Sequence, residues 1–181
     1  DVRNIKLIVA YDGTAYHGWQ RQPGLPTVQG ALEAAAAGVV GHPVDVNGAG
    51  RTDAGVHAAG QVASFRTSNT AIPLVKIARA VNGRCPDDVA VRSAEEVDAA
   101  FHASMSAVGK TYRYRLYVGA GKPVMRARFV WHVHPPLDVN RMNAAARRLV
   151  GRHDFAGFAA STDERSTTVR TLLGCSVAPV E

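Results

Sequence analysis

The stretch NGAGRTDAGVHAAGQVASF, residues 47–65, places a single acid, Asp53, among glycines and alanines, two residues after Arg51. Short strands are predicted on both sides of this glycine-rich loop, at Val44–Asn47 and Gln61–Arg66. Glycines let a backbone turn sharply or come close to another molecule. Asp53 is therefore either a turn aspartate that bonds its own backbone, or an ionised carboxylate that the loop presents to a ligand.

The segments before the loop predict a strand followed by a helix. Residues 3–12, RNIKLIVAYD, alternate in polarity and are rich in branched apolar side chains, as in a β-strand. In residues 24–41, Thr27 is placed as an N-cap and Gly41 as the stop of a helix. Apolar residues follow Thr27 on one helical face: Val28, Leu32, Ala35 and Val39.

The segments after the loop continue this alternation of helices and strands. A helix at Pro73–Val81 and a strand at Val89–Ser93 complete a first lobe, which we expect to end near residue 100. A second lobe is predicted to hold strands at 110–118, 128–135 and from 168, with a helix in 137–151 that Asp138 caps and that turns Val139, Met142, Ala146 and Leu149 inward. Its first strand should place Tyr112, Tyr114, Leu116 and Val118 on one face. The predicted class is α+β with mainly antiparallel sheets.

Charge is distributed unevenly along the chain. The 181 residues carry a net charge of +6, with −1 in residues 1–100 and +7 in residues 101–181. A basic region of this kind indicates a polyanionic partner such as nucleic acid, although it can also serve solubility alone. The two cysteines form no CxxC pair, which favours a reducing, cytoplasmic setting, and neither a membrane span nor a signal segment is predicted.

The absence of several known catalytic motifs excludes the classes of enzyme that depend on them. The loop does not complete G-x-G-x-x-G, and the chain has no P-loop, no G-x-S-x-G and no H-E-x-x-H. His132 and His134 share a strand face but have no obvious third ligand, so we expect no metal site. Residues 11–24, YDGTAYHGWQRQPG, could stack bases and bind phosphates, or could be an ordinary connection with Trp19 in the core.

The glycine-rich loop closely resembles the signature loop of the TruA family of tRNA pseudouridine synthases. The resemblance rests first on AGRTDAGVHA, residues 49–58. Further segments resemble the family in the same order: YDGTAYHGWQRQ (11–22), TVQGALE (27–33), VNGRCPDDVAV (81–91), FHASMSA (101–107) and KTYRYRLY (110–117). The family's usual FHAR reads FHAS here, so Ser104 stands where a basic residue that contacts RNA is expected.

The resemblance implies an isomerase that converts uridine to pseudouridine in the anticodon stem-loop of tRNA. The catalytic aspartate of the family falls on Asp53, its paired arginine on Arg51, and the tyrosine that stacks on the target uracil on Tyr112. The expected partner is tRNA, with no cofactor and no metal. The residues expected to contact RNA are Trp19, Gln20, Arg21, His57, Lys110 and Arg113.

The resemblance also implies a homodimer of chains with two ferredoxin-like lobes and an active-site cleft between them. The lobes correspond to residues 1–100 and 101–181. Family chains continue past the last residue here with further strands and a basic helix, so the second lobe is expected to be incomplete. The competing functions are an RNA-binding module that has lost the chemistry, and a nuclease or glycosidase, which would usually need paired carboxylates or metals.

Overall fold

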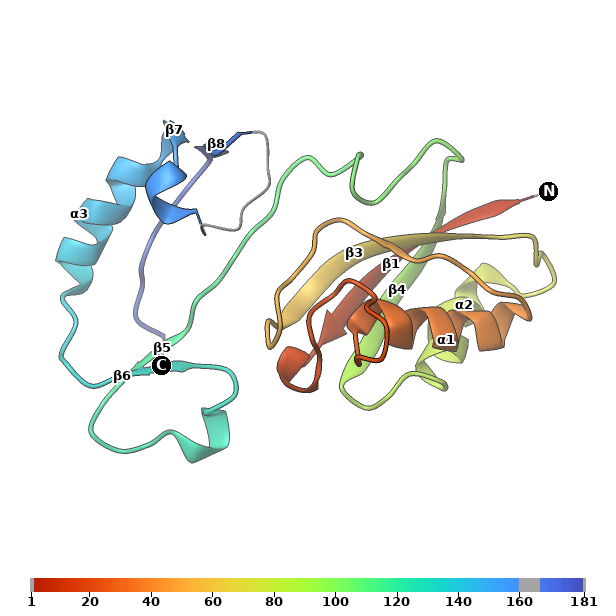
Figure 1. Ribbon diagram of the computed structural model, residues 1–181, viewed down its shortest axis with the longest axis horizontal. Coiled ribbons are helices and arrows are strands. Elements are labelled where there is room, and N and C mark those ends of the chain that lie inside the picture. Colours follow the sequence, from red (N-terminus) through yellow and green to blue (C-terminus); the bar gives the residue numbers. More distant parts are fainter. Residues whose placement is uncertain (1, 160–166, 181) are drawn as a thin grey trace. The chain divides into compact units, whose positions relative to one another are not determined.

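The computed structural model describes residues 2–159 and 167–180, and the chain forms two compact units, Asp1–Arg113 and Tyr114–Glu181 (Figure 1). The first unit extends past residue 100 because the following residues pack on its sheet. The side-chain amide of Asn4 donates to the carbonyl of Phe101 at 2.9 Å, and the backbone N–H of Ala103 donates to Ser64 Oγ at 3.3 Å. Residues 101–103 are therefore part of the first unit.

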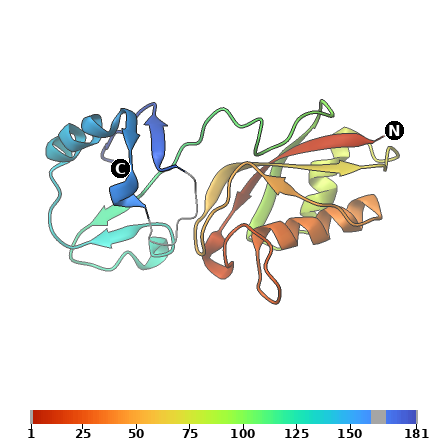
Figure 2. The same ribbon diagram turned by 45° about the horizontal axis from the view of Figure 1, so that its top comes forward.

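A four-stranded antiparallel sheet forms the first unit. Its strands are β1 (Arg3–Tyr11), β2 (Asn47–Gly48), β3 (Ala58–Thr67) and β4 (Val89–Val97), in the spatial order β2-β3-β1-β4. The predicted strand at Val44–Asn47 is reduced to its last residue, since β2 begins at Asn47. Both helices, α1 (Val28–Val40) and α2 (Leu74–Asn82), lie on the same face of the sheet (Figure 2).

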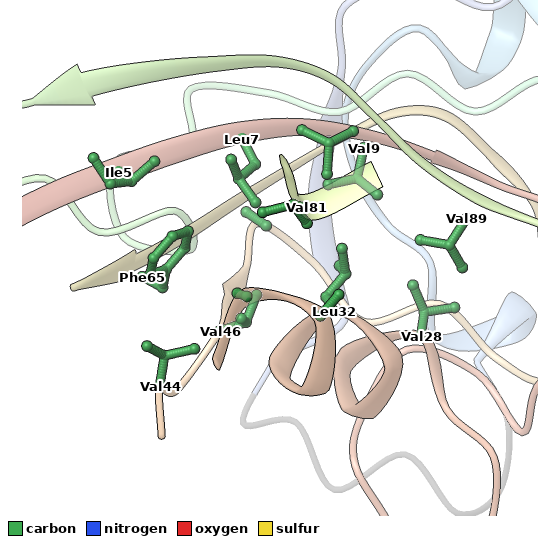
Figure 3. Packing of buried hydrophobic residues seen from close by; sticks show 14 of the residues in the cluster. Ile5, Leu7, Val9, Val28, Leu32, Val44, Val46, Phe65, Val81 and Val89 are labelled. Atoms are coloured by element: carbon green, nitrogen blue, oxygen red, sulfur yellow. The ribbon is translucent and has the colours of Figure 1, made fainter. Parts of the chain in front are cut away.

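The core of the first unit lies between the sheet and the two helices. Alternate residues of β1 are buried, and Figure 3 shows Ile5, Leu7 and Val9 in the same cluster as Val28 and Leu32 of α1. All five side chains are fully buried. Each such side chain stabilises the fold by about 1.5–3 kcal/mol relative to an exposed one. The alternation of β1 thus decides which face of the sheet the helices cover.

Both ends of α1 lie where the sequence predicts them. Thr27 Oγ1 accepts a hydrogen bond from the N–H of Gly30 at 3.3 Å, as an N-cap does, and Gly41 ends the helix with φ of 84°. A one-turn 3₁₀ helix, Gly13–Ala15, lies between β1 and α1. The segment from Asp12 to Thr27 therefore leaves the end of β1 and returns to α1 beside the glycine-rich loop.

The second unit contains two pairs of short strands and one α-helix within the residues described. β5 (Leu116–Val118) pairs in parallel with β6 (Trp131–Val133), while β7 (Gly151–Asp154) pairs antiparallel with β8 (Val169–Leu172). The helix α3 spans Val139–Leu149, and Asp138 accepts from the N–H of Arg141 at 3.0 Å, as predicted for its N-cap. Of the four residues predicted to face inward, Ala146 is buried and the others are half-buried: Val139, Met142 and Leu149.

The first predicted strand of the second lobe is largely wrong. β5 begins only at Leu116, so Tyr112 and Tyr114 lie outside the strand and do not share a strand face with Leu116, and both are exposed. Alternation of side chains is necessary for a strand, but the backbone also needs a hydrogen-bonding neighbour. β6 supplies that neighbour for Leu116–Val118, where the parallel register begins at Leu116 opposite Trp131.

Candidate active site

The glycine-rich loop, residues 49–57, is attached to β3 at its beginning. The N–H of Ala49 donates to the carbonyl of Val62 at 2.8 Å, directly after β2 ends. The side-chain amide of Gln61 then donates to the carbonyl of Gly50 at 2.5 Å. β3 therefore holds the two loop residues that precede Arg51.

Thr52, the residue before Asp53, is held at two of its atoms. Its carbonyl oxygen accepts from the N–H of Trp19 at 2.9 Å. Its hydroxyl lies 2.9 Å from the hydroxyl of Tyr11, the last residue of β1, with which it forms a hydrogen bond. Gly50 and Thr52 are thus hydrogen-bonded to the sheet, whereas Arg51 and Asp53, each the next residue along the chain, are exposed.

The loop reverses direction immediately after Asp53. The N–H of Val56 donates to the carbonyl of Asp53 at 3.2 Å, which closes a turn. Within the turn, Gly55 has a φ of 78°, which favours glycine, and its N–H donates to the carbonyl of Tyr16 at 3.2 Å. Backbone bonds thus place Asp53 at the start of a fixed turn.

The carboxylate of Asp53 differs from those of three loop aspartates that bond their own backbone. Asp12, Asp98 and Asp154 each accept a hydrogen bond from the backbone N–H two residues later, at 2.7–3.0 Å. The Asp53 side chain makes no hydrogen bond or ion pair with any residue that the structure describes. The geometry therefore contradicts the first interpretation, a turn aspartate that bonds its own backbone, and the Asp53 carboxylate is exposed.

The connection from β1 to α1 packs directly under the loop. A Cβ added at Gly18 would lie 2.5 Å from the carbonyl oxygen of Thr52 and 3.1 Å from the carbonyl carbon of Asp53. A Cβ added at Gly13 would overlap the carbonyl of Val56. The glycines of residues 11–22 are therefore needed because two backbones meet there.

The side chain of Trp19 is buried in the core and is not accessible to RNA. Its side chain is 2% exposed and packs on the Tyr11 ring, with 6.1 Å between the ring centroids. A Cβ at Gly48 would lie 2.5 Å from Cε2 of the same indole. The ring cannot stack on a base in this position, so its assignment to RNA contact is corrected: Trp19 supports the loop from below.

Arg21 is exposed but has a partner on α1. Its guanidinium bonds Glu33 Oε2 at 2.9 Å, and its own side chain is 60% exposed. Glu33 is buried and also accepts from the amide of Gln29 and from the N–H of Val46, both at 3.1 Å. Arg21 thus compensates a buried carboxylate that joins α1 to the segment before β2, and its exposed part is free to meet an anionic ligand.

Residues 110–113 bring further predicted site residues to the loop within the first unit. A Cβ at Gly50 would lie 2.6 Å from Lys110 Nζ, so this ammonium lies directly over the loop. The Tyr112 ring is 67% exposed, and its hydroxyl is near enough to Tyr11 to interact with it electrostatically. Arg113 and Gln20 are also exposed, and His57 is half-buried with Nδ1 accepting from the N–H of Gly13 at 3.1 Å.

Tyr11 was not identified from the sequence as part of the site. Burial raises the pKa of its hydroxyl above the ordinary value, and hydrogen bonds with Thr52 and Gln61 oppose part of that increase. The hydroxyl is therefore protonated at neutral pH and can donate. The sequence pattern shows Tyr11 only as the inward-facing end of a strand, and its partner Thr52 lies 41 residues away.

The structure offers no cluster for a metal ion and no membrane span in the part of the chain that it describes. Among residues 2–159 and 167–180, no three His, Cys, Asp or Glu side chains gather closely enough to hold an ion. His132 instead bonds the carbonyl of Gly119 at 2.6 Å and packs against His134. None of the helices described is long and apolar enough to cross a membrane.

Comparison with known proteins places these features in context. A family model described as tRNA pseudouridine synthase matches residues 7–104. A tRNA pseudouridine synthase A of Acetivibrio thermocellus is 44% identical over 97% of this chain and 72% of its own length. Those of Geotalea uraniireducens and Syntrophotalea carbinolica are 45% and 46% identical over 98% of this chain and 72% and 70% of their own lengths.

Proposed function

Because this chain belongs to the family of tRNA pseudouridine synthases, we propose that it isomerises uridine to pseudouridine in tRNA, with Asp53 as the residue that starts the reaction. The observation that carries the role of Asp53 is its geometry. The carboxylate is exposed and makes no hydrogen bond among the residues described, while its backbone lies in a turn held by β1, β3 and the segment that includes Trp19.

The reaction rearranges bonds within one nucleotide. The C1′–N1 glycosidic bond breaks, the uracil turns, and a C1′–C5 bond forms. The proton on C5 leaves and N1 gains a proton, so the product has the same composition as the substrate. No oxidant, reductant or group donor is consumed, and we therefore propose that the enzyme needs no cofactor.

Asp53 can begin this rearrangement in three ways. Its carboxylate can attack C6 of the uracil, attack C1′ of the ribose, or remove the proton from C2′. Each route requires an ionised carboxylate that meets the nucleotide directly, which the exposed position of Asp53 allows. Arg51, two residues before Asp53, is also exposed and can pair with Asp53 or fill the gap that an extruded nucleotide leaves.

The uracil must leave its stack in the RNA before Asp53 can reach it. Extrusion of a nucleotide costs on the order of a few kcal/mol. The exposed ring of Tyr112, which lies near Tyr11 and hence near the loop, can stack on the extruded base and offset part of that cost. The ammonium of Lys110, which lies beside Gly50, can contact a neighbouring phosphate.

We further propose where the substrate binds and how the protein is organised. The excess of Lys and Arg in residues 101–181 supplies phosphate contacts, and Arg141, Arg147 and Arg148 of α3 are exposed. The first unit has the element order β1-α1-β2-β3-α2-β4, which supports a ferredoxin-like lobe. A second such lobe, a cleft between the lobes, a homodimer and the anticodon stem-loop as the target are proposed from the family resemblance.

A cytoplasmic setting is part of the same proposal. Cys85 and Cys175 are both free thiols rather than a disulfide, which supports a reducing compartment. Transfer RNA is a substrate that such a compartment supplies.

The test is pseudouridine formation in a tRNA transcript, located by carbodiimide modification and primer extension. We expect a signal in the anticodon arm with the unaltered protein and with Asp87→Asn, which changes another exposed acid outside the loop. Asp53→Asn should give no signal. A signal that survives in Asp53→Asn would contradict the role of Asp53. Salt-sensitive tRNA binding without any conversion by the unaltered protein would favour the RNA-binding module instead.

A further inference from the structure

Tyr11 is the only residue of β1 whose side chain reaches the glycine-rich loop through a hydrogen bond that the described structure records. The sheet is irregular where β1 ends: Val9 pairs with Gln61 of β3, but Tyr11 pairs with Ala58, so β3 holds one extra residue there. β-Bulges of this kind bend a strand and re-aim its side chains, and they are common next to active sites.

The phenol of Tyr11 is fixed on its other sides. The side chain is 5% exposed, and the buried Trp19 ring packs against it. Trp19 in turn donates its backbone N–H to the carbonyl of Thr52. Tyr11 thus bonds the side-chain hydroxyl of Thr52, and Trp19 bonds the backbone carbonyl of the same residue.

The Tyr11 hydroxyl and Gln61 bond residues on the two sides of Arg51. The contact of the hydroxyl is with Thr52 Oγ1 at 2.9 Å. The side chain of Gln61 is also close enough to lower the pKa of the hydroxyl, and its amide donates to the carbonyl of Gly50. The buried hydroxyl therefore holds Thr52, the residue between Arg51 and Asp53, while Gln61 beside it holds Gly50.

Resting on the proposed function, we propose that Tyr11 is a positioning residue for the isomerisation: through Thr52 it fixes the backbone that carries Asp53 in the orientation required for attack. Tyr11 itself does not touch the substrate in this proposal. A reacting group that is misplaced by about 1 Å can lose about a hundredfold in rate. Loss of the Tyr11 hydroxyl should lower the rate by less than about a hundredfold, because the other hydrogen bonds of the loop remain.

The test compares Tyr11→Phe with Tyr16→Phe in the complete protein. Tyr16 is a matched control because it is another buried tyrosine, 8% exposed, whose hydroxyl bonds Asp88 at 2.5 Å. Its contact with the loop is made by its backbone carbonyl, which accepts from the N–H of Gly55 and which the substitution leaves in place. We expect Tyr11→Phe to lower kcat about tenfold with KM for tRNA within twofold of the unaltered value. Tyr16→Phe should lower thermal stability at least as much and leave kcat within twofold.

A double-mutant cycle locates the effect in the bond between Tyr11 and Thr52. Thr52→Val removes the other hydroxyl while keeping the branched shape, so it should lower kcat by a similar factor. The double variant Tyr11→Phe/Thr52→Val should be no slower than the slower single variant, because both changes break the same bond. Thr52→Ser, which keeps the hydroxyl, should retain kcat within about threefold.

Amide hydrogen exchange supplies a readout that does not depend on activity. Tyr11→Phe should speed exchange at the amides of Trp19 and Val56, which bond Thr52 and Asp53, at least about fivefold. Tyr16→Phe should leave both rates unchanged. If the unaltered protein forms no pseudouridine, the proposed function fails, and these rates alone decide whether Tyr11 holds the loop.

Three results would overturn the role of Tyr11. The first is a kcat for Tyr11→Phe within twofold of the unaltered value. The second is a double variant whose loss equals the product of the two single losses. The third is equal exchange rates at Trp19 and Val56 in both tyrosine variants.

Discussion

The alpha carbon of Gly18 faces the carbonyl oxygen of Thr52 so closely that a Cβ on Gly18 would lie 2.5 Å from that oxygen. Gly18 also has a φ of 88°. The segment that leaves β1 therefore supports the loop of Asp53 through direct backbone contact, and the two stretches must be considered as one site.

Gly18→Ala is expected to destabilise the protein and slow the reaction. The positive φ alone costs a non-glycine residue about 1–3 kcal/mol. Gly24→Ala is the matched control, because Gly24 has a φ of 73° but a Cβ there meets no atom within 4 Å. Urea unfolding of both variants, together with kcat, separates the cost of φ from the cost of the contact. Equal effects on stability and kcat would show that the contact with Thr52 does not matter.

Tyr112→Phe and Tyr112→Ala should differ strongly in activity. Stacking on a base contributes about 1–3 kcal/mol, and phenylalanine keeps the ring. We expect kcat/KM within about threefold of normal for Tyr112→Phe and a loss of about tenfold to a hundredfold for Tyr112→Ala. Because the ring is exposed, both variants should unfold at the same temperature as the unaltered protein. Equal activity of the two variants would argue against stacking.

Glu33→Ala should be among the more destabilising changes in α1. The buried carboxylate accepts bonds from Arg21, Gln29 and Val46, and its removal leaves the N–H of Val46 without this acceptor. Loss of bonds to a charged group and an unsatisfied donor costs about 2–4 kcal/mol. Glu95→Ala breaks an exposed ion pair with Lys6 and should cost at most about 1 kcal/mol. Urea unfolding gives both values, and equal costs would contradict the buried role of Glu33.

Alkaline pH should destabilise the protein through its buried tyrosines. Burial, and for Tyr16 also the hydrogen bond with Asp88, raise the pKa of Tyr11 and Tyr16 above the ordinary value of 10.0. A raised pKa in the folded state means that the folded protein holds these protons more tightly than the unfolded chain. This contribution is complete below a pH of about 10 and is lost as pH rises through the folded-state values.

Tyr16→Phe isolates that contribution. Its free energy of unfolding should fall less between about pH 9 and about pH 11 than that of the unaltered protein, because one titrating phenol is absent. Unfolding by urea at a series of pH values measures the slopes. Identical slopes would mean that the phenol of Tyr16 does not carry the dependence.

Local sequence signals predicted much of the first unit. Alternation along β1 and the caps of α1 act within a few residues, so Thr27 and Gly41 mark the helix ends without tertiary information. The strand at 110–118 failed because pairing depends on a distant partner, and only Leu116–Val118 has β6 beside it. β5 and β6 pair in parallel, while the other strand pairs in the described part of the chain are antiparallel, which agrees with the prediction of mainly antiparallel sheets.

The candidate site was predicted only where a motif carried it. Asp53 and Arg51 lie in a loop whose motif is recognisable from the sequence. The burial of Trp19, in contrast, requires a glycine at position 48, which is 29 residues later in the chain. The bond between Arg21 and Glu33 crosses from a loop to a helix. The sequence pattern shows Tyr11 only as a strand residue, because its hydrogen-bond partner Thr52 is distant in the chain and is brought close by the fold. Contacts between distant segments cannot be derived from periodicity.

Release of tritium from the C5 position of uracil tests the central claim most directly, because the new C1′–C5 bond replaces the C5–H bond. A tRNA labelled at C5 of uridine should lose tritium to water in a single turnover with the unaltered protein and with Asp87→Asn. Asp53→Asn should bind the same tRNA with an unchanged Kd and release none. Release by Asp53→Asn at the unaltered rate would contradict the account, since the chemistry would then not depend on this carboxylate.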